Sequence, residues 1–431
     1  MDSSLKQHLE KLECHFTWDL SSSKNELKAL LRDLKDVDQQ TCTWLLHYYN
    51  LLGYIQHALG SNTEALKYLH QAEMVTEEQE TEESGVRLQV NKANLAWIYF
   101  YLGEMEKSKG YLEEVERLQQ MYPAPSECDL HPEVSGEKGW TLLKFNKSKK
   151  HQAIDYFKKA LKAEPERTKW QKGLALAISK AHTDQNCTPE LKAKILTQLK
   201  TAHEKEPNNL LLYGLYLEKL SEVQSEENER EMQALLEKAF ETEDLECLGT
   251  ILRYFRTISV DKAIREAERA REKFPNSSRV LKLLAICNKW KVYNRYTDRQ
   301  ERVTLARKSI GLFEEVVRHY PDSLREKIAL ASMYNYANYN EKADEIYQQL
   351  VSEIDDFPPP SQQHIYYSYA HFLHHTRKPG SINFHIKVAE IPVNTTYREN
   401  SIKVLEKIVR EGKSPLCKKI VDVLKAIQLE L

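Results

Sequence analysis

The stretch Asn50-Leu-Leu-Gly-Tyr-Ile-Gln-His-Ala-Leu-Gly60, followed by Ala65, Leu69 and Ala72, decides the fold class. Its first glycine lets two helices approach closely, and its last glycine stands where the first helix ends. Ala65, Leu69 and Ala72 follow at the three- and four-residue spacing that turns one face of a second helix inward. The stretch therefore predicts two antiparallel helices joined by a short turn.

The same pattern of small, aromatic and helix-ending residues recurs downstream. The recurrences are Ala96–Gly103 with Leu112 and Val115, then Ala153, Phe157, Ala160 and Pro165, and later Ala263, Ala267, Ala270 and Pro275. A repeat of about 34 residues with these features is the signature of tetratricopeptide helix pairs, which stack into a solenoid. We expect an all-α, tetratricopeptide-repeat superhelical solenoid whose groove is lined by the first helix of each pair.

The repeat divides most of the chain into helix pairs. Residues 1–42 are predicted to be N-terminal capping helices, and the proline-rich segment 122–132 a hinge. After Pro358-Pro359-Pro360 we expect a helix near 363–376, an irregular stretch from Pro379-Gly380, and a last helical segment over 397–430. The eight predicted pairs lie near 43–76, 88–120, 134–165, 168–206, 209–242, 245–274, 278–320 and 323–355. The predicted domains are 1–121 (capping helices and first repeats), 133–243 (middle repeats) and 244–431 (basic repeats and C-terminal helices).

Composition supports a folded helical protein. The 431 residues include only 13 Gly and 14 Pro, with 41% hydrophobic and 29% charged residues, a balance that favours helices with a real core. The sequence contains no apolar run of membrane-spanning length and begins with a polar segment, so we expect a cytoplasmic protein that does not bind membranes. The seven cysteines are scattered and are expected to be reduced thiols.

Catalytic motifs are absent from the sequence. It has no Walker A loop, glycine-rich nucleotide fingerprint, His-Glu-x-x-His or nucleophile elbow. His371, His374 and His375, with His385 further on, have helical spacing, but no Cys or carboxylate completes a zinc site, so a polar helix surface is the favoured interpretation. We expect no enzyme activity, no catalytic or metal-binding residue and no cofactor.

Charge is unevenly distributed along the chain. Between Ile251 and Gly311 there are sixteen Lys or Arg against six Asp or Glu, a balance of +10, whereas the whole chain carries −2. Aromatic residues are interleaved with these cations, and this combination suits the phosphates and unpaired bases of single-stranded nucleic acid. The alternative is ordinary solubilising charge on a scaffold for protein–protein assembly, with an acidic peptide or protein as the partner.

Three motifs and two shorter matches carry a resemblance to a known family. The motifs are Cys14-His-Phe-Thr-Trp18, Tyr49-Asn-Leu-Leu-Gly-Tyr54 and Glu137-Lys-Gly-Trp-Thr-Leu-Leu-Lys-Phe145. The shorter matches are Val90-Asn91 through Ala96-Trp-Ile-Tyr99, and Ser259-Val-Asp-Lys-Ala263. Together they resemble the interferon-induced proteins with tetratricopeptide repeats. The resemblance implies an innate antiviral effector that binds the 5′ end of foreign single-stranded RNA, triphosphorylated or with an incompletely methylated cap, in a positively charged groove. Such a protein blocks translation of the RNA, and its further partners would be other family members or translation factors.

The resemblance also implies RNA-binding residues. Trp140 matches a family tryptophan that stacks on a cap base, and Lys144, one helical turn along the same helix, matches a lysine that lines the phosphate site. Lys180 stands where the family usually has an arginine, and Lys150 stands in the place of a tyrosine. The further residues implied or taken from the basic repeats are Arg32, Arg253, Arg256, Lys282 and Lys289.

Overall fold

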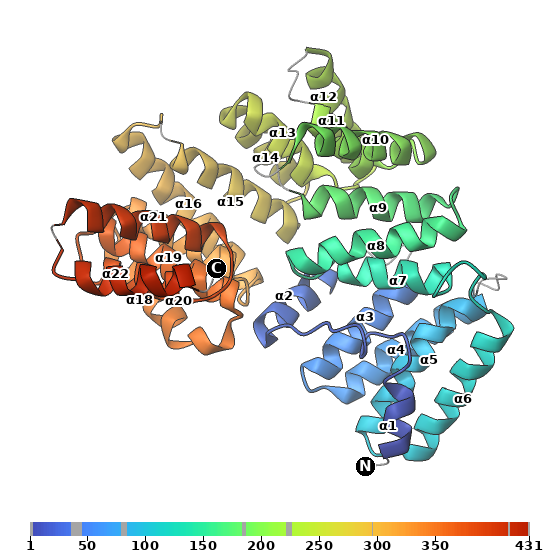
Figure 1. The fold of residues 1–431 in the computed structure, drawn as a ribbon. Coiled ribbons are helices and arrows are strands. Elements are labelled where there is room, and N and C mark those ends of the chain that lie inside the picture. Colours follow the sequence, from blue (N-terminus) through green and yellow to red (C-terminus); the bar gives the residue numbers. More distant parts are fainter. Residues whose placement is uncertain are drawn as a thin grey trace. The chain divides into compact units, whose positions relative to one another are not determined.

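The computed structural model describes residues 3–35, 45–78, 84–182, 187–220, 226–294, 296–412 and 414–429. Within these ranges the regular elements are helices, and no strand occurs (Figure 1). The all-α solenoid predicted from the repeat is therefore confirmed. The chain forms two compact units, here called unit 1 (residues 1–21 and 30–254) and unit 2 (residues 22–29 and 255–431).

Unit 1 contains the N-terminal helices and the first five helix pairs. The capping helices are α1 (Ser3–Leu9) and α2 (Lys24–Lys35), and the boundary between the units falls within α2 and within α13 (Leu248–Ile258). The pairs are α3 (Leu45–Ala58) and α4 (Asn62–Glu78), α5 (Ser84–Tyr101) and α6 (Met105–Met121), α7 (Pro132–Leu142) and α8 (Lys147–Ala163), α9 (Thr168–Ala181) and α10 (Pro189–Lys205), and α11 (Leu210–Leu220) and α12 (Glu226–Glu241).

The first helices of unit 1 form a continuous row. Helix α3 packs on α5, α5 on α7, α7 on α9 and α9 on α11, and each of these first helices also packs on its own second helix. This is the stacking expected of tetratricopeptide pairs, in which a pair buries its apolar face only against its neighbour. The row brings residues that are far apart in sequence onto one face of unit 1.

Glycines act in the first pair as the sequence predicts. A Cβ on Gly53 would lie 2.6 Å from Leu69 Cγ, so only glycine allows α3 and α4 to approach this closely. Gly60 follows α3 with a φ of +93°, a left-handed conformation that glycine adopts without strain.

The motif before the first repeat fastens the N-terminal segment to unit 1. His15 is buried, its backbone N–H donates to Asn94 of α5 (3.2 Å), and its ring contacts the hydroxyl of Thr141 on α7 (3.1 Å). Trp18 is buried and donates to Glu13 (2.7 Å), and Phe16 stacks on Trp97. Core packing by Phe16 and Trp18 explains this motif.

Unit 2 continues the repeat with helices of similar length. After the end of α13 come α14 (Val260–Lys273), α15 (Ser278–Tyr293), α16 (Arg299–His319), α17 (Leu324–Tyr336), α18 (Asn340–Ser352), the short 3-10 helix η2 (Ile354–Asp356) and α19 (Pro359–His375). All eight pairs predicted from the sequence are present. First helices again pack in sequence, α15 on α17, α17 on α19 and α19 on α21 (Thr396–Glu411).

The C-terminal region is more regular than predicted. The expected irregular stretch after Pro379-Gly380 is helix α20 (Ser381–Glu390), and the expected single segment over 397–430 is two helices, α21 and α22 (Cys417–Leu429). Gly380 and Gly412 have φ angles of +101° and +64°, so each glycine is a turn between helices. Ile386, Leu405 and Ile420 form the core that joins them.

The hinge predicted at residues 122–132 lies within one unit. Residues 122–131 connect α6 to α7, and both helices belong to unit 1. The three-part domain division stays a prediction.

Six cysteines of the described ranges are free thiols, and Cys42 lies outside those ranges. None of the described helices has the length and apolarity needed to cross a lipid bilayer.

Candidate nucleic-acid interface

Unit 1 has a pocket of about 660 Å³ at one edge of its row of first helices. Basic side chains dominate its polar lining. The lining residues are Leu45, Leu46, His47, Arg87, Lys169, Lys172, Lys205, Glu206, Pro207, Asn208 and Asn209.

The pocket lies where four first helices begin. Leu45 opens α3, Arg87 is in the first turn of α5, Lys169 is the second residue of α9, and Asn209 directly precedes α11. The first N–H groups of a helix lack partners within the helix and carry part of the positive end of its dipole. Four such ends beside four cations make this pocket suited to an anion.

Three cations of this region share one buried carboxylate. Glu133, in the first turn of α7, is 2% exposed. Arg87 Nε lies 3.4 Å and Arg167 Nη2 lies 3.5 Å from its oxygens, and Lys169 also pairs with it. One negative charge thus holds three positive charges in place at the pocket wall.

The remaining cations of the pocket have weaker or more exposed partners. Lys172 Nζ lies 3.8 Å from Glu206, and Lys205 Nζ lies 2.7 Å from Glu166, whose side chain is 90% exposed. The Lys172–Glu206 contact is long and Glu166 is exposed, so each of these pairs should contribute little free energy. Lys172 and Lys205 are therefore available to exchange their partners for a bound anion.

The pKa of Lys169 reflects the surplus of positive charge. Burial lowers this pKa, the Glu133 carboxylate raises it, and Arg87 and Arg167 lower it again, so that it lies below its usual value. An anion in the pocket would relieve the repulsion among these cations.

A buried polar network supports the wall beside His47. The His47 Nδ1 atom lies 2.9 Å from Glu137, Asn50 donates to Glu137 (2.8 Å), and Asn91 donates to Asn50 (2.8 Å). Burial raises the pKa of Glu137, but His47, His15 and the Asn50 hydrogen bond lower it more, so this carboxyl stays ionised. The network fixes α3, α5 and α7 relative to one another.

The RNA-binding residues predicted on α7 lie at the opposite edge of the row of first helices, where α7 ends. Trp140 is half-buried near the end of α7 and meets Phe157 edge-on at 5.3 Å. Lys144 was predicted to lie on the same helix, which is wrong: α7 ends at Leu142, and Lys144 is exposed in the following turn. The cause is the turn formed as the Lys144 and Phe145 amides donate to Thr141 and Leu142.

Lys150 and Lys180 come from helices that touch. His151 of α8 and His182 just after α9 make an edge-on ring contact at 4.8 Å, so the first turn of α8 lies beside the end of α9. Burial, then His151 and Lys147, lower the pKa of His182. Lys180 is exposed there, eleven residues from Lys169 along α9, or about 16 Å at the rise of an α-helix.

Arg32 and Arg253 also belong to unit 1. Arg32 is half-buried on α2. Arg253 makes a two-point contact with Glu218 (2.9 and 3.0 Å) and donates to Thr250 (3.1 Å). This arginine is therefore engaged by neighbouring side chains.

The three predicted residues of unit 2 have different surroundings. Arg256 is exposed and lies over the ring of Trp290, with 4.6 Å between the guanidinium carbon and the ring centre. Lys282 lies 3.5 Å from Glu326 and over the ring of Tyr320. Lys289 is half-buried on α15.

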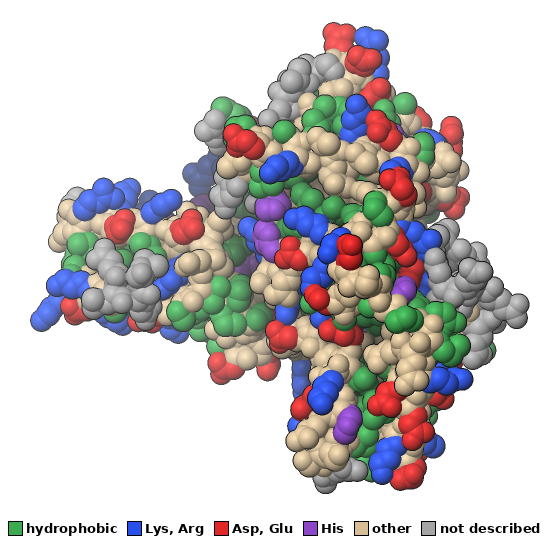
Figure 2. Space-filling view, turned by 45° about the vertical axis from the view of Figure 1, so that its right-hand side comes forward, with side chains coloured by type: hydrophobic (Ala, Val, Ile, Leu, Met, Phe, Trp, Pro, Cys, Tyr) green, Lys and Arg blue, Asp and Glu red, His purple; other side chains and the backbone are tan. Residues whose placement is uncertain are grey.

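Part of the charge excess of residues 251–311 is neutralised by carboxylates from outside this segment. Arg253 pairs with Glu218, Arg271 with Glu315, and Lys282 with Glu326. Figure 2 shows the same interleaving of basic and acidic side chains over the visible face. Arg295, another cation of this segment, lies outside the described residues.

The histidines near residue 371 do not form a metal centre in the described part of the chain. His374 and His375 are exposed, and His385 is buried and contacts Ser401 at 3.0 Å. Among the described residues, no group of three or more His, Cys, Asp or Glu side chains has the geometry to hold a metal ion.

Sequence reasoning missed the cations that line the pocket. Arg87, Lys169, Lys172 and Lys205 lie outside residues 251–311, the segment selected by its charge excess. Arg87 and Lys169 lie in the first turns of first helices, so a search for basic residues at that repeat position would have found these two.

Known proteins resemble this chain in both repeat and overall sequence. The family model described as Tetratricopeptide repeat matches residues 46–78 and 92–120. The human "Antiviral innate immune response effector IFIT1" is 29% identical over 429 residues, covering 95% of this chain and 88% of the relative. Human "Interferon-induced protein with tetratricopeptide repeats 2" is 27% identical, covering 97% and 90%.

Solved structures of one of these relatives also resemble this chain over nearly its whole length. The structure described as "Human IFIT1 dimer with m7Gppp-AAAA" matches with a TM-score of 0.71 at 27% identity, covering 98% of this chain and 94% of that chain. "Human IFIT1 dimer with PPP-AAAA" matches with a TM-score of 0.69 at 26% identity, with the same coverage.

The fold and the repeat matches define a tetratricopeptide-repeat protein. The particular family resemblance predicted from the three motifs is confirmed: across nearly its whole length, this chain is similar to the interferon-induced proteins with tetratricopeptide repeats.

Proposed function

We propose that this protein is a non-catalytic antiviral effector that binds the 5′ end of foreign single-stranded RNA and blocks its translation in the cytoplasm. The RNA carries a 5′-triphosphate or an incompletely methylated cap. The observation that carries the proposal is the unit 1 pocket, where Arg87, Lys169, Lys172 and Lys205 meet at the beginnings of four first helices.

A 5′-triphosphate matches the chemistry of this pocket. Its charges are concentrated on three adjacent phosphates, whereas an internal phosphodiester carries a single charge. The pocket offers several cations beside the positive ends of four helix dipoles within one volume. Because Glu133 already holds Arg87 and Lys169, these side chains lose little conformational entropy when RNA binds.

The similar proteins support the ligand. Human IFIT1, which is 26% to 27% identical in the matched structures, has been solved with PPP-AAAA and with m7Gppp-AAAA. We assign Trp140 to stacking on a base, and Lys144, Lys150 and Lys180 to phosphates of the same RNA. Arg32, Arg253, Arg256, Lys282 and Lys289 complete the proposed set of RNA-binding residues.

Blocking translation needs no chemical step. A 5′ end that is enclosed in a protein pocket is inaccessible to the factors that begin translation. The similar human protein is described as an innate immune effector, and the repeat scaffold suits binding rather than catalysis.

The test compares one RNA with two 5′ ends. We expect 5′-triphosphate RNA to bind at least tenfold more tightly than the same RNA with a 5′-hydroxyl, and to be translated less in an extract that contains the protein. Equal affinity for the two RNAs would overturn the proposal. A partner protein that stays bound after nuclease treatment, together with equal RNA affinities, would support the scaffold alternative.

A further inference from the structure

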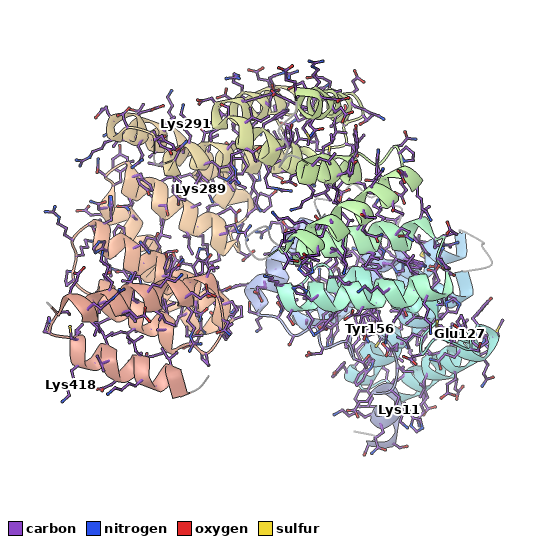
Figure 3. The ribbon with its side chains drawn as sticks, turned by 45° about the horizontal axis from the view of Figure 1, so that its top comes forward. Lys11, Glu127, Tyr156, Lys289, Lys291 and Lys418 are labelled. Atoms are coloured by element: carbon purple, nitrogen blue, oxygen red, sulfur yellow. The ribbon has the colours of Figure 1, made fainter. Side chains whose placement is uncertain are left out.

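A second group of basic and aromatic side chains lies on the first helices of unit 2. It takes one residue from each of four successive first helices: Lys289 from α15, Arg325 from α17, His364 from α19 and Tyr397 from α21. These helices pack one on the next. Figure 3 labels Lys289 on α15, beside Lys291 of the same helix. The group is here called the Lys289 cluster.

The cations of the Lys289 cluster have no carboxylate at ion-pair distance among the described residues. Arg325 is exposed and Lys289 is half-buried. The acidic group that acts on Lys289 is Glu326, which is 3.5 Å from Lys282 and bonded to Ser323. Lys291, on the same helix as Lys289, does pair with two carboxylates, those of Asp261 and Glu301.

Electrostatics shows that the charges of the cluster act on one another. Burial lowers the pKa of Lys289, and the charge of Arg325 lowers it further, while Glu326 partly opposes them. Burial, Arg325 and Lys289 lower the pKa of His364 to about 4. Side chains from three helices are thus close enough to repel one another, which costs free energy that a bound anion would recover.

An aromatic surface lies against these cations. The rings of His364 and Tyr397 are stacked at 4.6 Å with 12° between their planes, and Tyr367 lies 5.4 Å from Tyr397. All three rings are half-buried, so part of each is accessible. Arg325 lies on α17, which packs against α19, and burial raises the pKa of Tyr397 while the charge of Arg325 lowers it.

We propose that the Lys289 cluster is a second RNA site, which binds an internal phosphodiester through Lys289 and Arg325 and the adjoining unpaired base through the His364–Tyr397 stack. A phosphodiester offers acceptor oxygens to both the guanidinium fork and the ammonium group. Aromatic faces bind bases of any sequence. A carboxylate of an acidic peptide would satisfy the charges but would leave the ring stack unused, so nucleic acid fits better.

This site acts independently of the 5′ end. The choice of RNA as the ligand rests on the proposed function, but the site recognises the body of the RNA and not its terminal phosphates. It therefore contributes equally to 5′-triphosphate and 5′-hydroxyl RNA.

The test uses the full chain and a volume-conserving double variant, Lys289→Met with Arg325→Gln. We expect its affinity for a 5′-hydroxyl oligonucleotide to fall about tenfold, and its affinity for the 5′-triphosphate form to fall by the same factor. The matched control is Lys291→Met with Arg271→Gln, which removes two ion-paired cations of the same unit and should leave both affinities within twofold. Unchanged affinity for both RNAs in the Lys289 and Arg325 variant would overturn the inference.

A second variant pair tests the aromatic contribution. Tyr397→Leu should weaken binding of the 5′-hydroxyl RNA several-fold, while Tyr397→Phe should retain it, because stacking needs the ring and not the hydroxyl. If polyglutamate displaces the RNA and binds Tyr397→Leu as well as the wild type, the site recognises carboxylates and the inference is wrong. If wild type shows no preference for a 5′-triphosphate but these variants lose 5′-hydroxyl RNA, the proposed function fails and the second site stands.

Discussion

The unit 1 pocket and the Lys289 cluster of unit 2 both gather cations from several helices, but they hold them differently. In the pocket, Arg87 and Lys169 are anchored to the buried carboxylate of Glu133. In the cluster, Lys289 and Arg325 repel each other and have no carboxylate at ion-pair distance in the described ranges. An anchored set is preorganised for a compact, highly charged anion, whereas an unanchored pair depends on the ligand to neutralise it.

The largest expected effect comes from removing the anchor. Glu133→Gln leaves Arg87, Arg167 and Lys169 close together without their shared negative charge, and should lower the free energy of unfolding by about 3–5 kcal/mol. Glu326→Gln in unit 2 affects one close ion pair, with Lys282, and should cost about 2 kcal/mol. Urea denaturation of both variants measures the difference. A smaller loss of stability for Glu133→Gln than for Glu326→Gln would contradict the stronger anchoring role assigned to Glu133.

The salt dependence of RNA binding should also differ between the two sites. If four phosphate charges are neutralised in the pocket, raising salt from 50 to 200 mM should weaken its RNA binding by about fiftyfold. The two cations of the Lys289 cluster should contribute about sevenfold over the same range. Titrations of 5′-triphosphate RNA at several salt concentrations give both slopes, using Lys172→Ala with Lys205→Ala and Lys289→Met with Arg325→Gln. Each double variant removes two cations, so each should reduce the magnitude of the salt slope by about 1.4, and a wild-type slope in either variant would contradict the assignment of charges.

Acid should weaken unit 1 through the buried His15. Burial lowers the pKa of His15 to about 4 from its ordinary 6.5, so the unfolded chain binds more protons between these pH values. The stability of unit 1 is therefore complete above pH 6.5 and is lost as pH falls, by about 2 kcal/mol at pH 5.

His364 of unit 2 gives the contrast to His15. Its pKa is also lowered to about 4, but partly by Arg325 and Lys289, whose effect a bound phosphate would cancel. Denaturation at pH 7 and pH 5 with and without 5′-hydroxyl RNA tests this, with His15→Asn as the variant that lacks the unit 1 titration. If the stability of His15→Asn depends on pH as strongly as that of the wild type, His15 does not cause the loss of stability in acid.

The smallest effect is expected for the residues at the far end of the row of first helices. Trp140→Ala should weaken RNA binding by about tenfold through lost base stacking, and Lys144→Glu by a similar factor. Fluorescence anisotropy with capped and triphosphate RNA measures both. Wild-type affinity in both variants would show that this end of the row does not contact RNA.

Sequence alone was sufficient for the repeat architecture, because Gly53, Gly60 and the alanines of each pair have fixed roles in packing. It failed where a Pro-Gly turn at residues 379–380 was interpreted as the start of an irregular stretch, since such a turn also joins α19 to α20. It failed again at Lys144, where the helix ends two residues earlier.

The candidate site was harder to predict for a physical reason. Counting charge along the chain selected residues 251–311, yet several cations there are paired with carboxylates from other helices. The pocket gathers Arg87 from the α5/α6 pair and Lys172 and Lys205 from the α9/α10 pair. Only the stacking of first helices brings these residues together, and that arrangement is not visible in local composition.

The most direct test of the central claim asks whether the unit 1 pocket recognises the 5′ phosphates themselves. The measurement is the ratio of affinities for 5′-triphosphate and 5′-hydroxyl RNA in wild type, in Lys172→Ala with Lys205→Ala, and in Lys200→Ala, an exposed control on the same helix as Lys205. The account predicts that the ratio falls about tenfold or more in the double variant and stays unchanged in the control. A ratio that survives in the double variant would contradict it.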